Sequence, residues 1–210
     1  MKFYYTLLFF LFTINFSQSQ QKAVTETGDE VVLFDEGTWE YMNEDHLKKT
    51  IIPTNYRPFK KDNKSSFLLK SKNLNIGIWL DPKTWSFKKG TDNSDAEYEF
   101  QLKDGDLYGL VISEKIEIPL ETLKSVALTN AKSVAPDIKI INEEYRTVNG
   151  LKVLMIQMNG TTQGIKISYY GYYFSNSSGS VQLLTYTSRN LMDSLKNESD
   201  KLLNGLVESN

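Results

Sequence analysis

The alternation of hydrophobic and polar residues predicts that most of the chain after residue 73 forms antiparallel β-strands. Residues 97–103 alternate strictly between apolar and polar side chains, which is typical of a half-buried strand. Residues 107–113 and 151–158 are apolar on both faces, so these strands are expected to be covered on both sides. Turn sequences rich in Gly, Asn and Asp lie between the strands and favour hairpins. The expected strands are residues 74–80, 97–103, 107–113, 138–148, 151–158, 165–174 and 181–187.

Two segments repeat their apolar residues at the helical interval of three to four. The first begins at Pro119, where the missing N–H costs nothing, and is expected to end before Pro136. The second begins near Asn190, a candidate N-cap residue. The apolar stripes are Leu120, Leu123, Ala127 and Ala131 in the first helix, and Leu191, Leu195, Leu202 and Leu206 in the second.

Strands that are covered on both faces require a layer on each side of the sheet, and one helix on each face supplies these layers. The sequence therefore predicts an α+β fold over residues 73–207. We expect an α/β/α sandwich with an antiparallel sheet of about six to seven strands and one helix on each face. This length is normal for a single domain.

The N-terminal region has the pattern of a secretory signal peptide over residues 1–19. Lys2 provides a positive charge, residues 3–16 form an almost unbroken apolar run, and residues 17–19 provide the small residues of a cleavage site. A transmembrane anchor is the alternative, but the apolar run is shorter than the roughly 20 residues that span a bilayer. We therefore expect an exported protein, periplasmic or extracellular, with no stable membrane span after cleavage.

Residues 20–72 separate this signal from the main domain. Residues 31–34 and 38–42 are strand-like runs joined by a three-residue loop that ends at Gly37, which predicts a β-hairpin within residues 20–43. Residues 44–72 carry Pro and many Lys without a sustained period, and we interpret them as a linker that is partly ordered at residues 67–69. His46 lies there and is expected to be a solvated side chain.

Composition excludes several kinds of function. With 24 Lys and Arg against 26 Asp and Glu, the formal net charge is −2, and a dedicated nucleic-acid binder needs a basic surface. The chain has no Cys and one His, which excludes disulfides, thiol nucleophiles and zinc sites with Cys ligands. No glycine-rich nucleotide-binding motif occurs. We expect no cofactor and no metal ion.

The order of the elements resembles the α/β/α sandwich of the PsbP-like superfamily, which includes the Ran-binding Mog proteins and the DcrB/EagR-type bacterial proteins. Residues 76–85 (IGIWLDPKTW) are similar to the opening strand of the family with its following Pro and Trp. Residues 169–174 and 181–186 are similar to its closing hairpin, and residues 202–206 to the end of its final helix. The resemblance implies an adaptor, chaperone or assembly factor that binds proteins, and it supplies no shared catalytic residues.

Aromatic residues are concentrated in residues 169–174. The strand period places Tyr170, Tyr172 and Phe174 on one face, and Trp79 and Trp85 could extend this cluster. One interpretation is core packing, because aromatic residues favour strands. The other is a binding surface for a protein segment or an apolar ligand, since such surfaces are enriched in Tyr and Trp. A binding surface would leave most of these rings contiguous and accessible to solvent.

The preferred function is a secreted or periplasmic, non-catalytic binding or accessory protein. Its partner would be an envelope or secreted protein, or an apolar small molecule. The first alternative is an envelope hydrolase that uses carboxylate or Ser-Lys chemistry, which would need a carboxyl group with a raised pKa in a cleft. The second is a structural accessory domain that docks through the hairpin. The candidate carboxylate pairs are Asp104 with Asp106, Glu114 with Glu117, and Glu143 with Glu144.

Overall fold

The computed structural model describes residues 21–25, 30–35, 37–42, 51–91, 93 and 95–209 of the 210-residue chain. The expected signal peptide of residues 1–19 and His46 lie outside the described residues. Near the N-terminus, β1 (Gln21–Val24), β2 (Glu30–Leu33) and β3 (Trp39–Tyr41) form a three-stranded sheet. The β2–β3 hairpin pairs as the sequence predicts, and Gly37 adopts a φ of +82° in its loop. The short polar strand β1 was not predicted.

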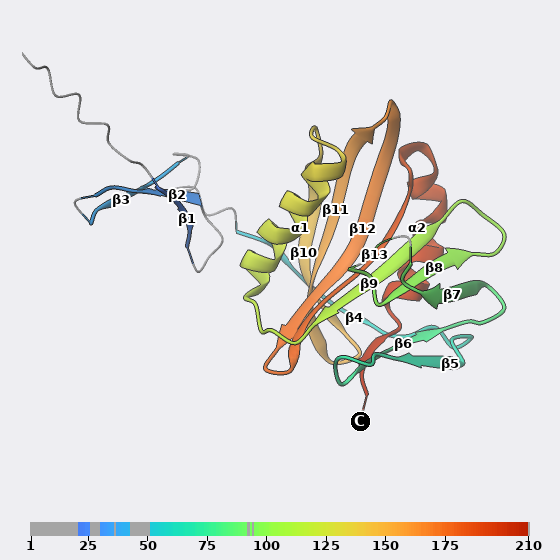
Figure 1. The fold of residues 1–210 in the computed structure, drawn as a ribbon. Helices are drawn as coiled ribbons and strands as arrows, with labels where there is room; N and C mark the ends of the chain where they lie inside the picture. The colour runs from blue at the N-terminus through green and yellow to red at the C-terminus, as the bar shows by residue number, and fades with distance from the viewer. Residues whose placement is uncertain are drawn as a thin grey trace, which may run out of the picture.

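An eight-stranded sheet forms the main body of the protein, in the order β4-β10-β11-β12-β13-β9-β8-β7 (Figure 1). Neighbouring strands are antiparallel, except that β4 runs parallel to β10. The α+β class is confirmed, but the sheet is mixed and larger than the six to seven strands expected. Its strands are β4 (Thr54–Phe59), β7 (Trp85–Lys89), β8 (Tyr98–Leu102), β9 (Tyr108–Glu114), β10 (Lys139–Val148), β11 (Leu151–Thr162), β12 (Ile165–Asn176) and β13 (Gly179–Ser188).

The linker expected over residues 44–72 must be corrected, because its second part contains two strands. Strand β4 joins the edge of the large sheet, and β5 (Phe67–Lys70) pairs with β6 (Ile76–Leu80). Most side chains of β4 are exposed and the strand contains Pro58, so it shows no apolar alternation. An edge strand of this kind leaves little signal in a sequence.

A small third sheet has the order β14-β6-β5, and it corrects the expected end of the last helix. Leu206 was placed on the stripe of that helix, but it belongs to β14 (Leu206–Glu208). The backbone turns at Gly205, where a Cβ atom would lie 1.9 Å from the carbonyl oxygen of Trp79. The amide of Trp79 donates to the carbonyl of Gly205 at 2.8 Å. This close approach requires glycine and starts the pairing of β14 with β6.

Helices α1 (Leu120–Val134) and α2 (Arg189–Leu203) pack against the large sheet (Figure 1). Leu123 of α1 clusters with Leu154 and Ile156 of β11, whereas Met192 of α2 clusters with Val153, the neighbouring β11 position. Because successive side chains of a strand point to opposite faces, the two helices contact opposite faces of the sheet. Within the described ranges, no helix is long and apolar enough to cross a membrane.

Polar contacts also connect α1 to the sheet. The hydroxyl of Tyr145 on β10 donates to the carboxylate of Glu121, and Lys124 forms a 3.1 Å ion pair with Glu143. The bond from Tyr145 is the main reason that the pKa of Glu121 lies below its usual value. Burial and the nearby Glu121 raise the pKa of Tyr145, which keeps its hydroxyl protonated as a donor.

Candidate functional site

The five aromatic residues predicted as a binding surface are mostly buried. Tyr170 and Tyr172 have no exposed surface, Trp85 is 2% exposed and Phe174 is 6% exposed. All four belong to the core cluster that contains α2, while Trp79 is half-buried on β6. The surface interpretation of this face is therefore wrong: a helix covers it, and the rings fill the space between helix and sheet.

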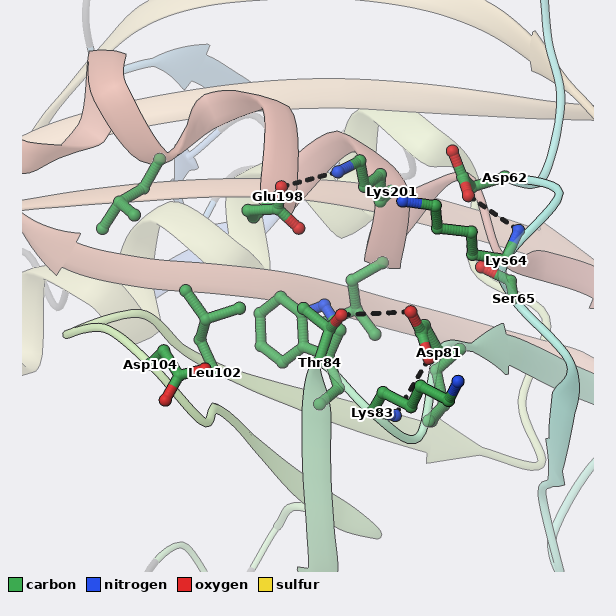
Figure 2. A pocket seen from close by; sticks show the side chains of 14 residues that line it. Asp62, Lys64, Ser65, Asp81, Lys83, Thr84, Leu102, Asp104, Glu198 and Lys201 are labelled. Atoms are coloured by element: carbon green, nitrogen blue, oxygen red, sulfur yellow. Dashed lines mark hydrogen bonds and ion pairs between the residues drawn. The ribbon is translucent and has the colours of Figure 1, made fainter.

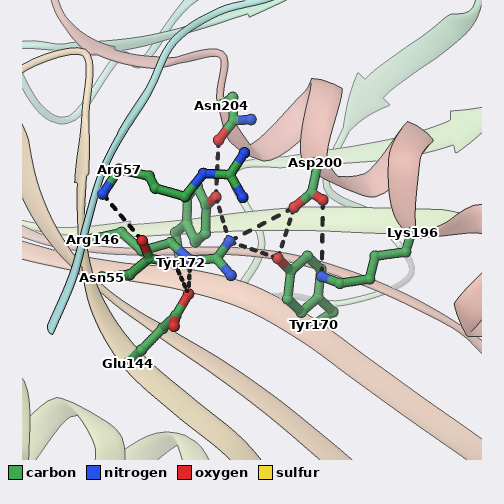
Figure 3. Close-up of polar contacts among 9 residues, drawn as sticks. All are labelled: Asn55, Arg57, Glu144, Arg146, Tyr170, Tyr172, Lys196, Asp200 and Asn204. Carbon is green, nitrogen blue, oxygen red and sulfur yellow. Dashed lines mark hydrogen bonds and ion pairs between the residues drawn. The ribbon is translucent and has the colours of Figure 1, made fainter. Parts of the chain in front are cut away.

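The buried hydroxyls of these tyrosines bond to one arginine, as Figure 3 shows. Arg146 of β10 donates from Nη1 to the hydroxyl oxygens of Tyr170 and Tyr172, at 2.7 and 3.0 Å. Each hydroxyl then donates in turn, Tyr170 to Asp200 of α2 at 2.7 Å and Tyr172 to Asn204, the residue that caps the C-terminus of α2, at 2.8 Å. These five residues form a network, called here the Arg146 network, that joins β10, β12 and α2.

The charge of Arg146 is well compensated although the residue is only 8% exposed. Its Nε donates to Glu144 at 2.5 Å, Nη1 lies 3.7 Å from Asp200, and the guanidinium sits 4.5 Å from the centre of the Phe59 ring. Burial alone would lower the pKa of Arg146, but the tyrosine hydroxyls and Glu144 outweigh it and raise the pKa. A network in which each polar group already has a partner is a structural anchor.

A pocket of about 440 Å³ lies beside α2, and we call it the α2 pocket (Figure 2). Four segments meet there: residues 62–65, the β6–β7 turn, the β8–β9 turn and residues 195–202 of α2. Such a volume is typical of small-molecule sites. The apolar part of its wall is formed by the buried side chains of Leu80, Trp85, Leu102 and Leu202 and by the half-buried Leu195.

The β6–β7 turn owes its shape to Asp81. The carboxylate of Asp81 accepts from the backbone N–H of Lys83 at 2.9 Å and from the hydroxyl of Thr84 at 3.1 Å. The N–H of Trp85 donates to the Asp81 carbonyl at 2.9 Å, which closes the turn and fixes the start of β7. The backbone bond from Lys83 is the main cause of the lowered pKa of Asp81.

The remaining charged residues of the α2 pocket come from the other three segments. Asp62 accepts from the backbone N–H of Lys64 at 2.8 Å, and Lys201 donates to Glu198 at 2.6 Å. Asp104 lies in the β8–β9 turn, at the end of the pocket that Leu102 occupies in Figure 2. Charges of both signs therefore surround an apolar interior.

The predicted carboxylate pairs do not come together in this pocket. Of those six residues, only Asp104 lines it. Glu143 pairs with Lys124, Glu144 with Arg146, and Glu114 and Glu117 are exposed. Within the described part of the chain, no group of three His, Cys, Asp or Glu residues is arranged to hold a metal ion.

Partly exposed aromatic rings occur on the opposite face of the sheet. Tyr169, Tyr186 and Tyr108 are direct neighbours across β12, β13 and β9. Their ring centres are 5.8 Å apart for Tyr169 and Tyr186, and 5.7 Å apart for Tyr186 and Tyr108. We call these three residues the tyrosine row. The strand period places Tyr169 on the face opposite Tyr170, but no pattern in the sequence marks that face as a surface.

Comparison with solved structures supports the fold. The chain is similar to cyanobacterial PsbP (CyanoP) from Synechocystis sp. PCC 6803, with a TM-score of 0.51, 16% identity, and coverage of 70% of this chain and 94% of that chain. The fold is therefore PsbP-like, as the sequence resemblance implied.

Two other solved structures are less similar and match about the same share of this chain. PA94 from Pseudomonas aeruginosa, a protein of unknown function and putative regulator, has a TM-score of 0.44 and 12% identity, and the match covers 67% of this chain and 95% of that chain. LpqN, involved in cell envelope biogenesis of Mycobacterium tuberculosis, has a TM-score of 0.47 and 13% identity, with 69% and 90% covered in the same order. No protein-family model and no curated protein matches the chain.

Proposed function

We propose that this is an exported, non-catalytic binding protein, periplasmic or extracellular, and that it holds a small molecule in the α2 pocket. The observation that carries the proposal is the pocket itself, which combines an apolar interior with polar groups from four segments. The signal peptide expected over residues 1–19 supports export, and the PsbP-like fold is compatible with an accessory role.

The structure changes the preferred ligand. The aromatic face that was expected to hold a protein segment is covered by α2, so it offers no room for an extended chain. The α2 pocket instead has the volume of a small-molecule site. The tyrosine row and the N-terminal sheet of residues 21–41 remain available as surfaces for a protein partner. No contact among the described residues favours one of these two surfaces over the other.

The hydrolase alternative receives less support. It needs a carboxyl group whose pKa is raised. In the described ranges, the carboxyl groups with a clearly shifted pKa are Asp81, Glu121 and Asp137, and all three are shifted downward.

Filling the pocket should remove the ligand. Leu195 is half-buried and lines the pocket, so Leu195→Trp places an indole in the ligand space. The buried residues of the pocket wall are left unchanged. Ser194 is the exposed neighbour on the same helix, and Ser194→Trp is the matched control. We expect native mass spectrometry of protein purified from its exporting host to detect a bound small molecule in wild type and Ser194→Trp. Leu195→Trp should lose it, whereas a ligand retained by Leu195→Trp would contradict the proposal.

A further inference from the structure

The N-terminal sheet of residues 21–41 has an apolar face that is open to solvent. The pairing of its strands places on that face Ala23, Val31, Leu33, Trp39 and Tyr41. The other face carries the charged residues Lys22, Glu30 and Glu40. Leu33, Trp39 and Tyr41 are exposed, and Trp39 keeps 50% of its surface. Units of fewer than about 40 residues usually need a disulfide, a metal ion or a partner to be stable, and the chain has no Cys, so this face calls for a partner.

Part of the large sheet also lacks a covering layer. On one face of the sheet, α1 packs against β11 and β12, and Figure 1 shows no helix over β9, β8 and β7 on that side. The tyrosine row lies on this face, and Leu110 and Ile112 are half-buried on the same side of β9. At the β7–β8 edge, Lys88 and Glu99 compensate each other in a 3.1 Å ion pair. The uncovered area is therefore mainly apolar and aromatic.

A hollow of about 190 Å³ opens beside the tyrosine row. Tyr108 and Tyr186 line one side of it, and residues of β7 and β8, among them Ser86 and Gln101, line the other. The hollow is smaller than the roughly 300–1,000 Å³ of small-molecule sites, and it suits a single large side chain. An aromatic side chain that fills such a pocket is the usual anchor of a protein interface. Trp39 is the largest exposed side chain of the N-terminal sheet and fits this role.

Charge indicates which partner covers the N-terminal sheet. Residues 21–45 contain one Lys and eight Asp or Glu, a net charge of −7. Residues 46–210 contain 22 Lys and Arg against 18 Asp and Glu, a net charge of +4. An anionic membrane surface or a nucleic acid repels so acidic a segment, whereas the rest of the chain attracts it. The covalent connection also keeps the two parts at a high effective concentration.

The connecting chain is long enough to reach the tyrosine row. The 12 Cα–Cα steps from Met42 to Thr54, the first residue of β4, span at most about 40 Å. In the sheet, β4 and β9 are five strands apart, which corresponds to about 24 Å. The difference of about 16 Å exceeds the diameter of the intervening helix α1, roughly 10–12 Å with its side chains.

We propose that the apolar face of the N-terminal sheet packs on the tyrosine row of the same chain, with Trp39 in the hollow beside Tyr108 and Tyr186. Two sheets that pack face to face bury the side chains of their facing surfaces as a common core. The contact withdraws both surfaces from outside partners. It is independent of the α2 pocket, whose apolar wall belongs to the core on the other face of the sheet.

The first test follows the indole N–H signal of Trp39 by NMR in ¹⁵N-labelled protein, with Trp39→Phe to assign it. Tyr108→Ser removes one wall of the hollow, and Tyr56→Ser removes the same ring from β4, where Tyr56 is 92% exposed. We expect Tyr108→Ser to increase the broadening of the Trp39 signal by a soluble gadolinium chelate at least three-fold. Tyr56→Ser should leave the broadening unchanged. Equal broadening in both variants would overturn the inference.

A disulfide then locates the contact, because introduced Cys residues have no native competitor in this chain. Thr38→Cys with Ser86→Cys joins the neighbour of Trp39 to the wall of the hollow. Thr38→Cys with Ser133→Cys is the matched control, since Ser133 is exposed on α1. We expect the first pair to oxidise at least ten-fold faster than the control and to yield a cross-linked monomer. Equal rates, or disulfide-linked dimers in place of monomers, would contradict docking within one chain.

Discussion

Replacing Tyr170 with Ala is expected to lower the free energy of unfolding by about 3–5 kcal/mol, the usual range for losing a large buried aromatic ring. The ring has no exposed surface and belongs to the core beneath α2. Its removal leaves a cavity and also takes away one hydrogen-bond partner each from Arg146 and Asp200. Urea unfolding, followed by circular dichroism, measures the change.

Tyr186→Ala is the control for this experiment. Tyr186 lies on the neighbouring strand but on the other face of the sheet, where it is only partly buried. We expect its replacement to cost about 1 kcal/mol. Comparably small losses at both positions would mean that Tyr170 is accessible and that α2 does not cover this face.

Replacing Arg146 with Met is expected to lower the free energy of unfolding by about 3 kcal/mol. Removal of one partner from a buried ionic network costs about 3–5 kcal/mol. The lower end applies because the side chains of Glu144 and Asp200 keep 19% and 33% exposure and can be partly resolvated. The loss is measured from the midpoint of urea denaturation, after checking that the m-value is unchanged.

Arg57→Met provides the matched comparison, since Arg57 is exposed on β4 near the same network (Figure 3). Its expected effect is about 0.5 kcal/mol or less, as for most surface substitutions. If Arg146→Met were as stable as Arg57→Met, the network would be dispensable, and the apolar contacts of α2 alone would hold the helix on the sheet.

Much of the fold follows from local pattern. The first helix was expected between Pro119 and Pro136 and spans Leu120–Val134, because a proline limits it on each side. The hairpin at Asn149 and Gly150 forms with both residues at positive φ, 49° and 91°, as this dipeptide favours. Strands such as β11, which are apolar on both faces, are covered on both faces.

Elements without a local pattern could not be predicted. Strand β4 is exposed along most of its length and carries Pro58, and the apolar residues 67–69 indicated order but not that they form the four-residue strand β5. Both depend on pairing with distant strands, β10 and β6. In the same way, Leu206 continued the helical stripe in the sequence, and only the approach of Gly205 to Trp79 ends the helix earlier.

The candidate site was harder still to predict. The strand period correctly separates Tyr170 and Tyr172 from Tyr169, but it does not say which face a helix covers. The α2 pocket joins residues from four segments, and of the predicted binding residues only Trp85 lines it. Arg146 carried a usable signal, because an arginine in a strand of the core must find buried partners, and two tyrosines on one face were available.

The most direct test of the account is a crystal structure of the protein purified from its native host. We predict electron density for a small molecule in the α2 pocket, with its apolar part in contact with Leu102 and Leu195. A pocket that holds only water, with ligand density over the tyrosine row instead, would contradict the central claim.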